Sequence, residues 1–153
     1  SEMCIRDSNI VNRLWDNIEK QDTWYESDLK VLNTILFAFP IEYIHQITEK
    51  ILERLEVYKH YSSIFQLRMM LLLNLSTLYL YNGDKLLCKQ LCYTLLEEAK
   101  ASKQYDTLAF AYIRIGICAN DAQLIENGLS LAKLVEDEHL LTELEREVNI
   151  FVN

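Results

Sequence analysis

The sequence predicts an all-α protein. Its 153 residues include only three glycines and one proline, which leaves little material for β-turns, whereas the good helix formers Leu and Glu abound. The stretch 67–81 is apolar at eleven of its fifteen positions. As a helix it would have no polar face wide enough to meet solvent, so we expect it at the centre of a helical stack.

The chain is acidic, with 23 acidic against 15 basic residues and a net charge of −8. It lacks the Lys/Arg clusters that bind phosphate backbones, so we expect this polypeptide alone to be a poor nucleic-acid binder. Its four cysteines show no disulfide or zinc spacing, and no signal peptide is visible. The 67–81 run is shorter than the about 20 residues of a membrane span. These features predict a reduced, cytoplasmic protein.

Residues 1–8 show no helical periodicity that continues into the next segment, and they resemble translated sequencing-adapter read-through. We therefore expect an artefactual leader, and a chain that is an N-terminally truncated piece of a longer protein. The domain proper is expected to span 9–153. Its first helix, about 9–20, carries apolar residues at spacings of four, namely Ile10, Leu14 and Ile18.

Three further helices are expected before residue 82. Asp22 or Thr23 is expected to cap a helix over 24–37, which Pro40 ends. The next, about 41–58, has a one-sided apolar stripe formed by Ile41, Ile44, Ile47, Ile51, Leu52 and Leu55. The fourth, about 61–81, contains the apolar run and ends at Asn82-Gly83 as a left-handed cap.

The second half predicts four more helices. Asp84 starts a helix with its apolar face formed by Leu87, Leu91, Cys92, Leu95, Leu96 and Ala99. A helix over 105–119 is apolar on several sides, and Asn120-Asp121 ends it and caps the next, about 122–135. The last helix, about 138–151, is expected to bury Leu140, Leu141, Leu144, Val148 and Phe151.

Helices that are apolar on all sides alternate along the chain with helices that are apolar on one side only. The sequence also contains a weak internal repeat. At a shift of 37 residues, Asp84, Leu87, Cys88 and Cys92 map onto Asp121, Leu124, Ile125 and Leu129. Repeats of 34 to 45 residues built from helix pairs are typical of α-solenoids. The prediction is a right-handed stack of antiparallel helix pairs, a tetratricopeptide-like solenoid of about eight helices, whose inner helices line a concave surface.

Catalytic and metal-binding patterns are weak. Glu42-x-x-His45 and Glu136-x-x-His139 match the Glu-x-x-His spacing of di-iron bundles. However, Glu42 and His45 lie on the polar side of their helix, and His139 lies at a helix junction in an acidic run. A packing role is favoured for the Cys88-x-x-x-Cys92 pair. We expect no enzyme activity, no metal and no cofactor.

Polar residues inside the apolar helices are the best candidates for binding. Arg68 and Asn74 would cost on the order of 1–3 kcal/mol or more if buried without partners. Six residues at 100° each place them roughly 120° apart, so they cannot face the same point. Either such residues satisfy one another between helices, or they line a shared groove. Candidates on three alternate helices are Asn33, Arg68, Asn74, Tyr112 and Arg114.

The motifs also resemble a known family. A set of short motifs along the chain carries the resemblance, namely Trp24-Tyr25-Glu26, Asn33, Phe37-x-Phe39, Arg68 and Leu71-Leu72-Leu73-Asn74, followed by Tyr112-Ile113-Arg114, Asn120-Asp121 and Gly128. This set is similar to the regulatory domain of Rgg/GadR/MutR transcriptional regulators. The resemblance covers about 9–153. It implies a bacterial cytoplasmic quorum-sensing regulator whose C-terminal helical repeats bind a short hydrophobic peptide pheromone and dimerise. The N-terminal helix-turn-helix that binds DNA would lie outside this chain.

Two interpretations remain open. In the first, the chain is a peptide-responsive regulatory module that clamps a peptide backbone through Asn side chains and a ligand carboxylate through Arg. In the second, it is a helical-repeat scaffold that docks a protein partner without sensing a pheromone. Of the candidate residues, Asn74 is the one we expect to bind the peptide backbone.

Overall fold

The structure, a computed structural model, describes the backbone of residues 2–152 and the side chains of residues 9–152. Within that range it has eight α-helices, one 3-10 helix and no β-strand, so the all-α prediction is confirmed. Contacts divide the chain into two compact units, 1–75 and 76–153. Stacking into a right-handed solenoid stays a prediction, and each unit is described by itself.

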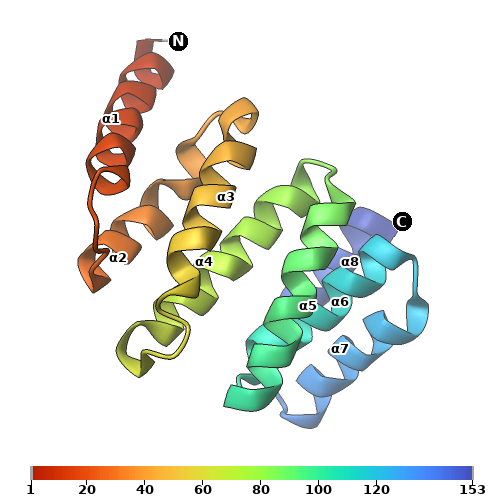
Figure 1. Cartoon of the computed structure of the whole chain (residues 1–153). Helices are drawn as coiled ribbons and strands as arrows, with labels where there is room; N and C mark the ends of the chain where they lie inside the picture. The colour runs from red at the N-terminus through yellow and green to blue at the C-terminus, as the bar shows by residue number, and fades with distance from the viewer. Residues whose placement is uncertain (1, 153) are drawn as a thin grey trace. The chain divides into compact units, whose positions relative to one another are not determined.

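Unit 1 begins with α1 (Glu2–Glu19) and α2 (Glu26–Ile35), continues through the 3-10 helix η1 (Leu36–Ala38) and α3 (Ile41–Glu56), and includes the first part of α4 (Ser62–Tyr81) (Figure 1). The core of this unit is formed by apolar residues of these helices together with Trp24 from the connection between α1 and α2. Its largest fully buried side chains are Trp24, Leu29, Leu32, Leu36, Ile44, Ile51, Leu55, Met69, Leu71, Leu72 and Leu75.

Two helix starts in unit 1 differ from the sequence prediction. The first helix begins at Glu2 instead of residue 9, although the artefactual origin of 1–8 stays a prediction. The second begins at Glu26, with Tyr25 at its N-cap instead of Asp22 or Thr23. The carboxylate of Asp28 accepts a hydrogen bond from the Tyr25 N–H at 2.8 Å, which satisfies the helix start from inside the first turn.

Trp24 was expected inside this second helix, but it lies just before it and anchors the connection instead. Its side chain is 2% exposed, and the indole N–H donates a hydrogen bond to the Ile18 carbonyl at 2.9 Å. The Trp15 ring packs edge-on against Trp24, and the Arg54 guanidinium lies 5.2 Å from the Trp24 ring centre. Trp24 is therefore placed where its large indole is buried and the indole N–H is hydrogen-bonded, and α2 begins only after it.

Unit 2 comprises the remainder of α4, then α5 (Lys85–Ser102), α6 (Tyr105–Ala119), α7 (Ala122–Leu134) and α8 (Glu138–Val152). Helix α6 packs against α5, α7 and α8, and α7 also contacts α8. One buried cluster of Ala109, Ile113, Ala132, Leu140 and Leu144 joins α6, α7 and α8. Helix α6 is therefore the central element of this unit, which agrees with its being apolar on several sides.

The two junctions that repeat at a spacing of 37 residues share one design. Gly83, with φ of 84°, and Asn120, with φ of 55°, both take the left-handed conformation that ends a helix. The next residue in each case, Asp84 or Asp121, accepts hydrogen bonds from backbone N–H groups in the first turn of the following helix. The predicted caps at both junctions are confirmed.

Helices α6 and α7 approach each other unusually closely at two glycines. A Cβ atom on Gly128 would lie 2.6 Å from Ile113 Cγ2 and 2.7 Å from the Ala109 carbonyl oxygen. A Cβ atom on Gly116 would lie 2.8 Å from the Asp121 carbonyl oxygen. Neither position has room for a side chain, so both glycines serve the packing of backbone against backbone.

Helix α4 has 20 residues and is long and apolar enough to cross a membrane by length and composition alone. The expectation that its apolar run is too short to span therefore does not hold for the whole helix. Half of its most apolar window is nevertheless buried inside the protein, as in the core helix of a globular domain. By itself such a helix is weak support for a membrane span.

Candidate functional site

Two predicted binding residues meet in unit 1. The Asn74 amide of α4 donates a hydrogen bond from Nδ2 to Oδ1 of Asn33 on α2, at 2.9 Å. Both side chains are half-buried, and Asn33 Nδ2 is a buried atom without a hydrogen-bond partner. The pair therefore joins α2 to α4 and still holds an amide donor whose hydrogen-bonding capacity is unused.

Arg68 lies in the same unit but is 3% exposed, so its guanidinium is enclosed by protein. Its positive charge acts on the carboxylate of Glu56. The pKa of Glu56 is lowered chiefly by a hydrogen bond from Lys59, with further contributions from the charges of Lys59 and Arg68. Arg68 thus contributes to the charge balance between α3 and α4, and it presents no open surface to a ligand carboxylate.

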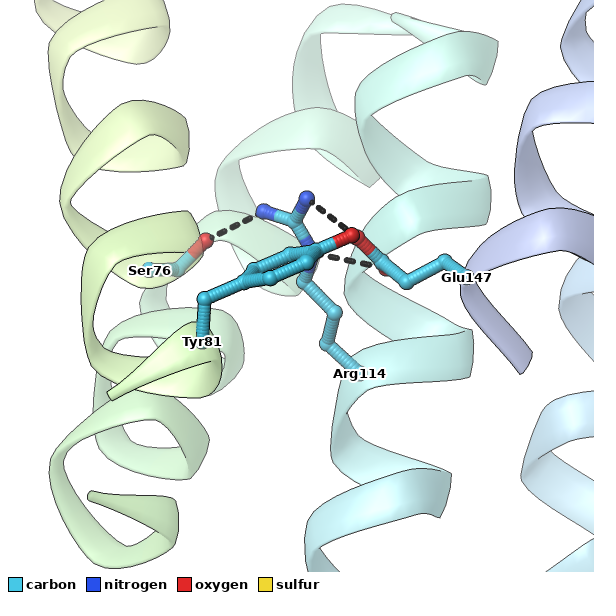
Figure 2. Close-up of polar contacts among 4 residues, drawn as sticks. All are labelled: Ser76, Tyr81, Arg114 and Glu147. Carbon is cyan, nitrogen blue, oxygen red and sulfur yellow. Dashed lines mark hydrogen bonds and ion pairs between the residues drawn. The ribbon is translucent and has the colours of Figure 1, made fainter. Parts of the chain in front are cut away.

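Arg114 of α6 belongs to unit 2, where it forms a buried ion pair with Glu147 of α8 (Figure 2). Its Nε and Nη2 donate hydrogen bonds to the two carboxylate oxygens at 3.0 and 2.9 Å, and both side chains are 5% exposed. Its Nη1 donates to the Ser76 hydroxyl of α4 at 2.8 Å. One guanidinium thereby connects three helices with bidentate geometry on the carboxylate.

The electrostatics of this network favour the ionised pair. Burial alone would lower the pKa of Arg114, but the hydrogen bonds to Glu147 and the charge of that carboxylate outweigh burial and raise it. Tyr81 donates from its hydroxyl to Glu147 Oε1 at 3.4 Å. Burial and the charge of Glu147 raise the pKa of Tyr81 above its usual value. The Arg114 guanidinium is thus already paired with a carboxylate of the protein itself, that of Glu147, in the position where a ligand carboxylate was expected.

Tyr112 is half-buried on another side of α6, with Lys100 Nζ 5.7 Å from its ring centre. Arg114 lies two positions beyond Tyr112, and residues at that spacing face nearly opposite sides of a helix. The structure thus brings Asn33 and Asn74 together in one unit, whereas Tyr112 and Arg114 point away from each other in the other unit.

Sequence reasoning missed Glu147 because it lies in an acidic run that reads as a solvated face. A signal was present, since Glu147 lies three residues beyond Leu144 and seven beyond Leu140. That spacing places the carboxylate in the apolar stripe of α8, and its side chain is accordingly buried. A buried acid within an apolar stripe predicts a buried cation on a neighbouring helix.

Sequence reasoning also missed a cluster of three thiols in unit 2. Cys88 and Cys92 lie one turn apart on α5 and are fully buried, and Cys118 of α6 is partly exposed. Cys88 lies within hydrogen-bonding distance of both other sulfur atoms. Cys118 comes near the end of α6 and Cys88 near the start of α5, so antiparallel packing of these helices places the two side by side.

Surface cavities lie elsewhere. One of about 440 Å³ is lined in unit 2 by Ala132, Lys133, Glu136, Asp137, Glu138 and Leu141, and one of about 390 Å³ lies in unit 1 between α1 and α3. His45 and His139 are largely exposed, each beside a glutamate one turn along its helix. Among the described residues, no group of three or more His, Cys, Asp or Glu is arranged to hold a metal ion.

Comparison of the chain with protein-family models, with curated proteins and with solved structures finds no match. The resemblance to Rgg/GadR/MutR regulators therefore stays a prediction that depends on the sequence motifs alone.

Proposed function

We propose that this chain is the regulatory domain of a bacterial, cytoplasmic transcriptional regulator of the Rgg/GadR/MutR type, and that it binds a short hydrophobic peptide and forms a homodimer. The observation that supports the proposal most directly is the Asn33–Asn74 pair, in which one buried amide donor has no acceptor. DNA would be bound only through a separate helix-turn-helix segment.

The amide pair has the chemistry that a peptide backbone requires. A peptide unit offers one carbonyl acceptor and one N–H donor, and an Asn side chain offers the complementary donor and acceptor. Because the Asn33 Nδ2 atom is buried, the proposed complex requires α2 and α4 to move apart locally, after which Nδ2 donates to a ligand carbonyl while Asn74 holds the orientation of the Asn33 amide. The surrounding apolar residues of α2 and α4 would receive Leu, Ile or Val side chains of the ligand.

In this proposal Arg68 and Arg114 have a structural role and, contrary to the sequence prediction, they do not bind a ligand carboxylate. Both guanidinium groups are nearly fully buried, and Arg114 already has a bidentate carboxylate partner. We assign Arg114 and its neighbour Tyr112 to holding α6 in place, and Arg68 to holding α3 and α4. Peptide binding at the amide pair would then shift the balance between helix arrangements of the dimer.

The test is a titration of the chain with a pool of fluorescently labelled octapeptides rich in Leu, Ile and Val, followed by fluorescence anisotropy. Asn33→Leu removes the unpartnered donor and keeps the side-chain volume similar. It should weaken binding by about 10-fold, as expected for loss of one hydrogen bond of about 1.4 kcal/mol. The same variant also removes the Oδ1 acceptor of the Asn74 amide, so its urea midpoint should fall by no more than the loss of that one half-buried hydrogen bond, about 1 kcal/mol.

Gln66→Ala provides the matched control, because Gln66 is an exposed amide on the same helix, α4. Its affinity for the peptide pool should equal that of the unmodified chain. Equal affinities for Asn33→Leu, Asn74→Ala and Gln66→Ala would refute the amide pair as the binding site. No binding to the unmodified chain at peptide concentrations up to about 1 mM would refute the peptide-sensing function itself.

A second candidate is a scaffold that docks a protein partner. It is favoured by Leu86 and Tyr93, which are 62% and 50% exposed and lie seven residues apart on one side of α5. Exposed apolar residues at that spacing are typical of a helix that contacts another helix. If Leu86→Ser abolishes self-association or partner binding while peptide binding is absent, the scaffold is the correct interpretation.

A further inference from the structure

The three thiols of unit 2 differ in their access to solvent. Cys88 and Cys92 are fully buried on α5, whereas Cys118, near the end of α6, is partly exposed. In Figure 1 the green α5 and the cyan α6 run side by side, and the two helices are in contact. Of the three thiols, Cys118 is therefore the one that a small oxidant in solution can reach, while Cys88 and Cys92 are enclosed.

We propose that Cys118 and Cys88 form a peroxide-reactive thiol pair, in which a hydroperoxide oxidises Cys118 and Cys88 then closes a disulfide between α5 and α6. The inference is independent of the proposed peptide binding, because it depends only on residues of unit 2.

The surroundings of Cys118 favour its thiolate. The hydrogen bond from the Cys88 thiol lowers the pKa of Cys118, and the positive charges of Lys85, Lys89 and Arg114 lower it further, against the opposing effect of burial. In contrast, its hydrogen bonds to the neighbouring thiols and burial raise the pKa of Cys88. Cys118 therefore has the properties of the attacking sulfur, and Cys88 those of a protonated partner.

The chemistry proceeds in two balanced steps. The Cys118 thiolate attacks one oxygen of hydrogen peroxide, the O–O bond breaks, and the hydroxide that leaves is protonated to water, which gives a sulfenic acid on Cys118. The Cys88 sulfur then attacks the Cys118 sulfur, the S–O bond breaks, and the leaving hydroxide combines with the Cys88 proton as water. Overall, two thiols are oxidised to a disulfide and one peroxide is reduced to two waters.

Cys118 has its hydrogen bond with Cys88, which makes Cys88 its nearest partner, and a competing bond between Cys88 and Cys92 is disfavoured by geometry. Residues one turn apart on a helix have Cβ atoms about 5–6 Å apart, whereas a disulfide requires about 3.5–4.5 Å. A bond from Cys88 to Cys92 would therefore need α5 to unwind. Cys88 and Cys118 come from two different helices that are in contact, so a bond between them does not require either helix to unwind.

The test is peroxide treatment of the folded chain in a Cys4→Ser background, followed by alkylation, digestion with trypsin without reduction, and mass spectrometry. Cleavage after Lys85, Lys89, Lys100, Arg114 and Lys133 separates the three cysteines into peptides 86–89, 90–100 and 115–133. We expect one cross-linked product, which joins 86–89 to 115–133 and disappears after reduction. In urea, where the geometry is lost, mixed pairings should replace it.

Variants separate the two roles. Cys118→Ser should abolish disulfide formation, and Cys88→Ala should leave a Cys118 sulfenic acid that dimedone traps. Cys92→Ser, the matched control, should still form the cross-link between 86–89 and 115–133. Cross-linking through 90–100 as the main product would overturn the proposal, as would an unmodified Cys118 in the folded, peroxide-treated chain. The mapping of the Cys4→Ser protein alone is decisive if the buried variants fail to fold.

Discussion

Removing Glu147 is the sharpest test of the Arg114 network. In Glu147→Leu the Arg114 guanidinium keeps its hydrogen bond to Ser76 but loses two charge-assisted bonds, and its side chain is only 5% exposed. Breaking one side of a buried ion pair costs about 3–5 kcal/mol, because the remaining charge is left without its partner. With a urea dependence of about 2 kcal/mol per molar, the unfolding midpoint should fall by about 2 M.

The double variant Arg114→Met/Glu147→Leu removes both charges and should recover about 3–5 kcal/mol relative to the single variant, because replacing a whole buried ion pair by apolar side chains is close to neutral. The assay is urea unfolding followed by far-UV circular dichroism and by tryptophan fluorescence. Since both tryptophans, Trp15 and Trp24, lie in unit 1, fluorescence reports that unit while circular dichroism reports the whole chain.

Glu145→Leu is the matched control, because Glu145 is exposed two residues away on the same helix. It should change the midpoint only slightly. The reasoning is refuted if Glu147→Leu and Glu145→Leu unfold at the same urea concentration, or if the double variant is no more stable than Glu147→Leu.

Two other perturbations follow from the packing and charges of unit 2. Gly128→Ala should destabilise the protein by about 1–3 kcal/mol in urea unfolding, because its Cβ would lie 2.6 Å from Ile113 Cγ2 and 2.7 Å from the Ala109 carbonyl oxygen; an unchanged midpoint would contradict this close packing. Folding raises the pKa of Tyr81, chiefly through burial and the charge of Glu147. The protonated Tyr81 hydroxyl therefore contributes fully to the free energy of unfolding below the unfolded pKa near 10.0, and this contribution is lost as the pH rises through the higher pKa of the folded state. Tyr81→Phe should accordingly make the alkaline fall of the urea midpoint shallower, and equal slopes for both proteins would contradict the shift.

Most of the fold could be predicted because helix periodicity and end signals are local. Pro40, Gly83 and Asn120 end or separate helices through their own backbone preferences, and Asp84 and Asp121 cap the helices that follow. The start of α2 was less predictable. Several residues before Glu26 are acceptable caps, and the choice among them depends on tertiary burial of the Trp24 side chain.

The candidate site was less predictable than the fold because it depends on pairs of residues far apart in sequence. The polar character of Asn33, Asn74 and Arg114 could be noticed, but not that Asn74 bonds Asn33 across 41 positions, or that Arg114 bonds Glu147 across 33. Both pairings are set by how helices are placed side by side. One-dimensional spacing carries that information only when a polar residue interrupts an apolar stripe.

The two glycines of the α6–α7 hairpin supply a criterion for recognising distant homologues. Backbone atoms of the opposite helix occupy the space that a side chain at Gly116 or Gly128 would need, so substitution there is incompatible with this helix spacing. Any homologue that keeps the hairpin should therefore keep both glycines twelve positions apart, with an Asx-type cap between them, even where other positions have diverged. That spacing is a physically motivated pattern for sequence searches, and it identifies the hairpin independently of function.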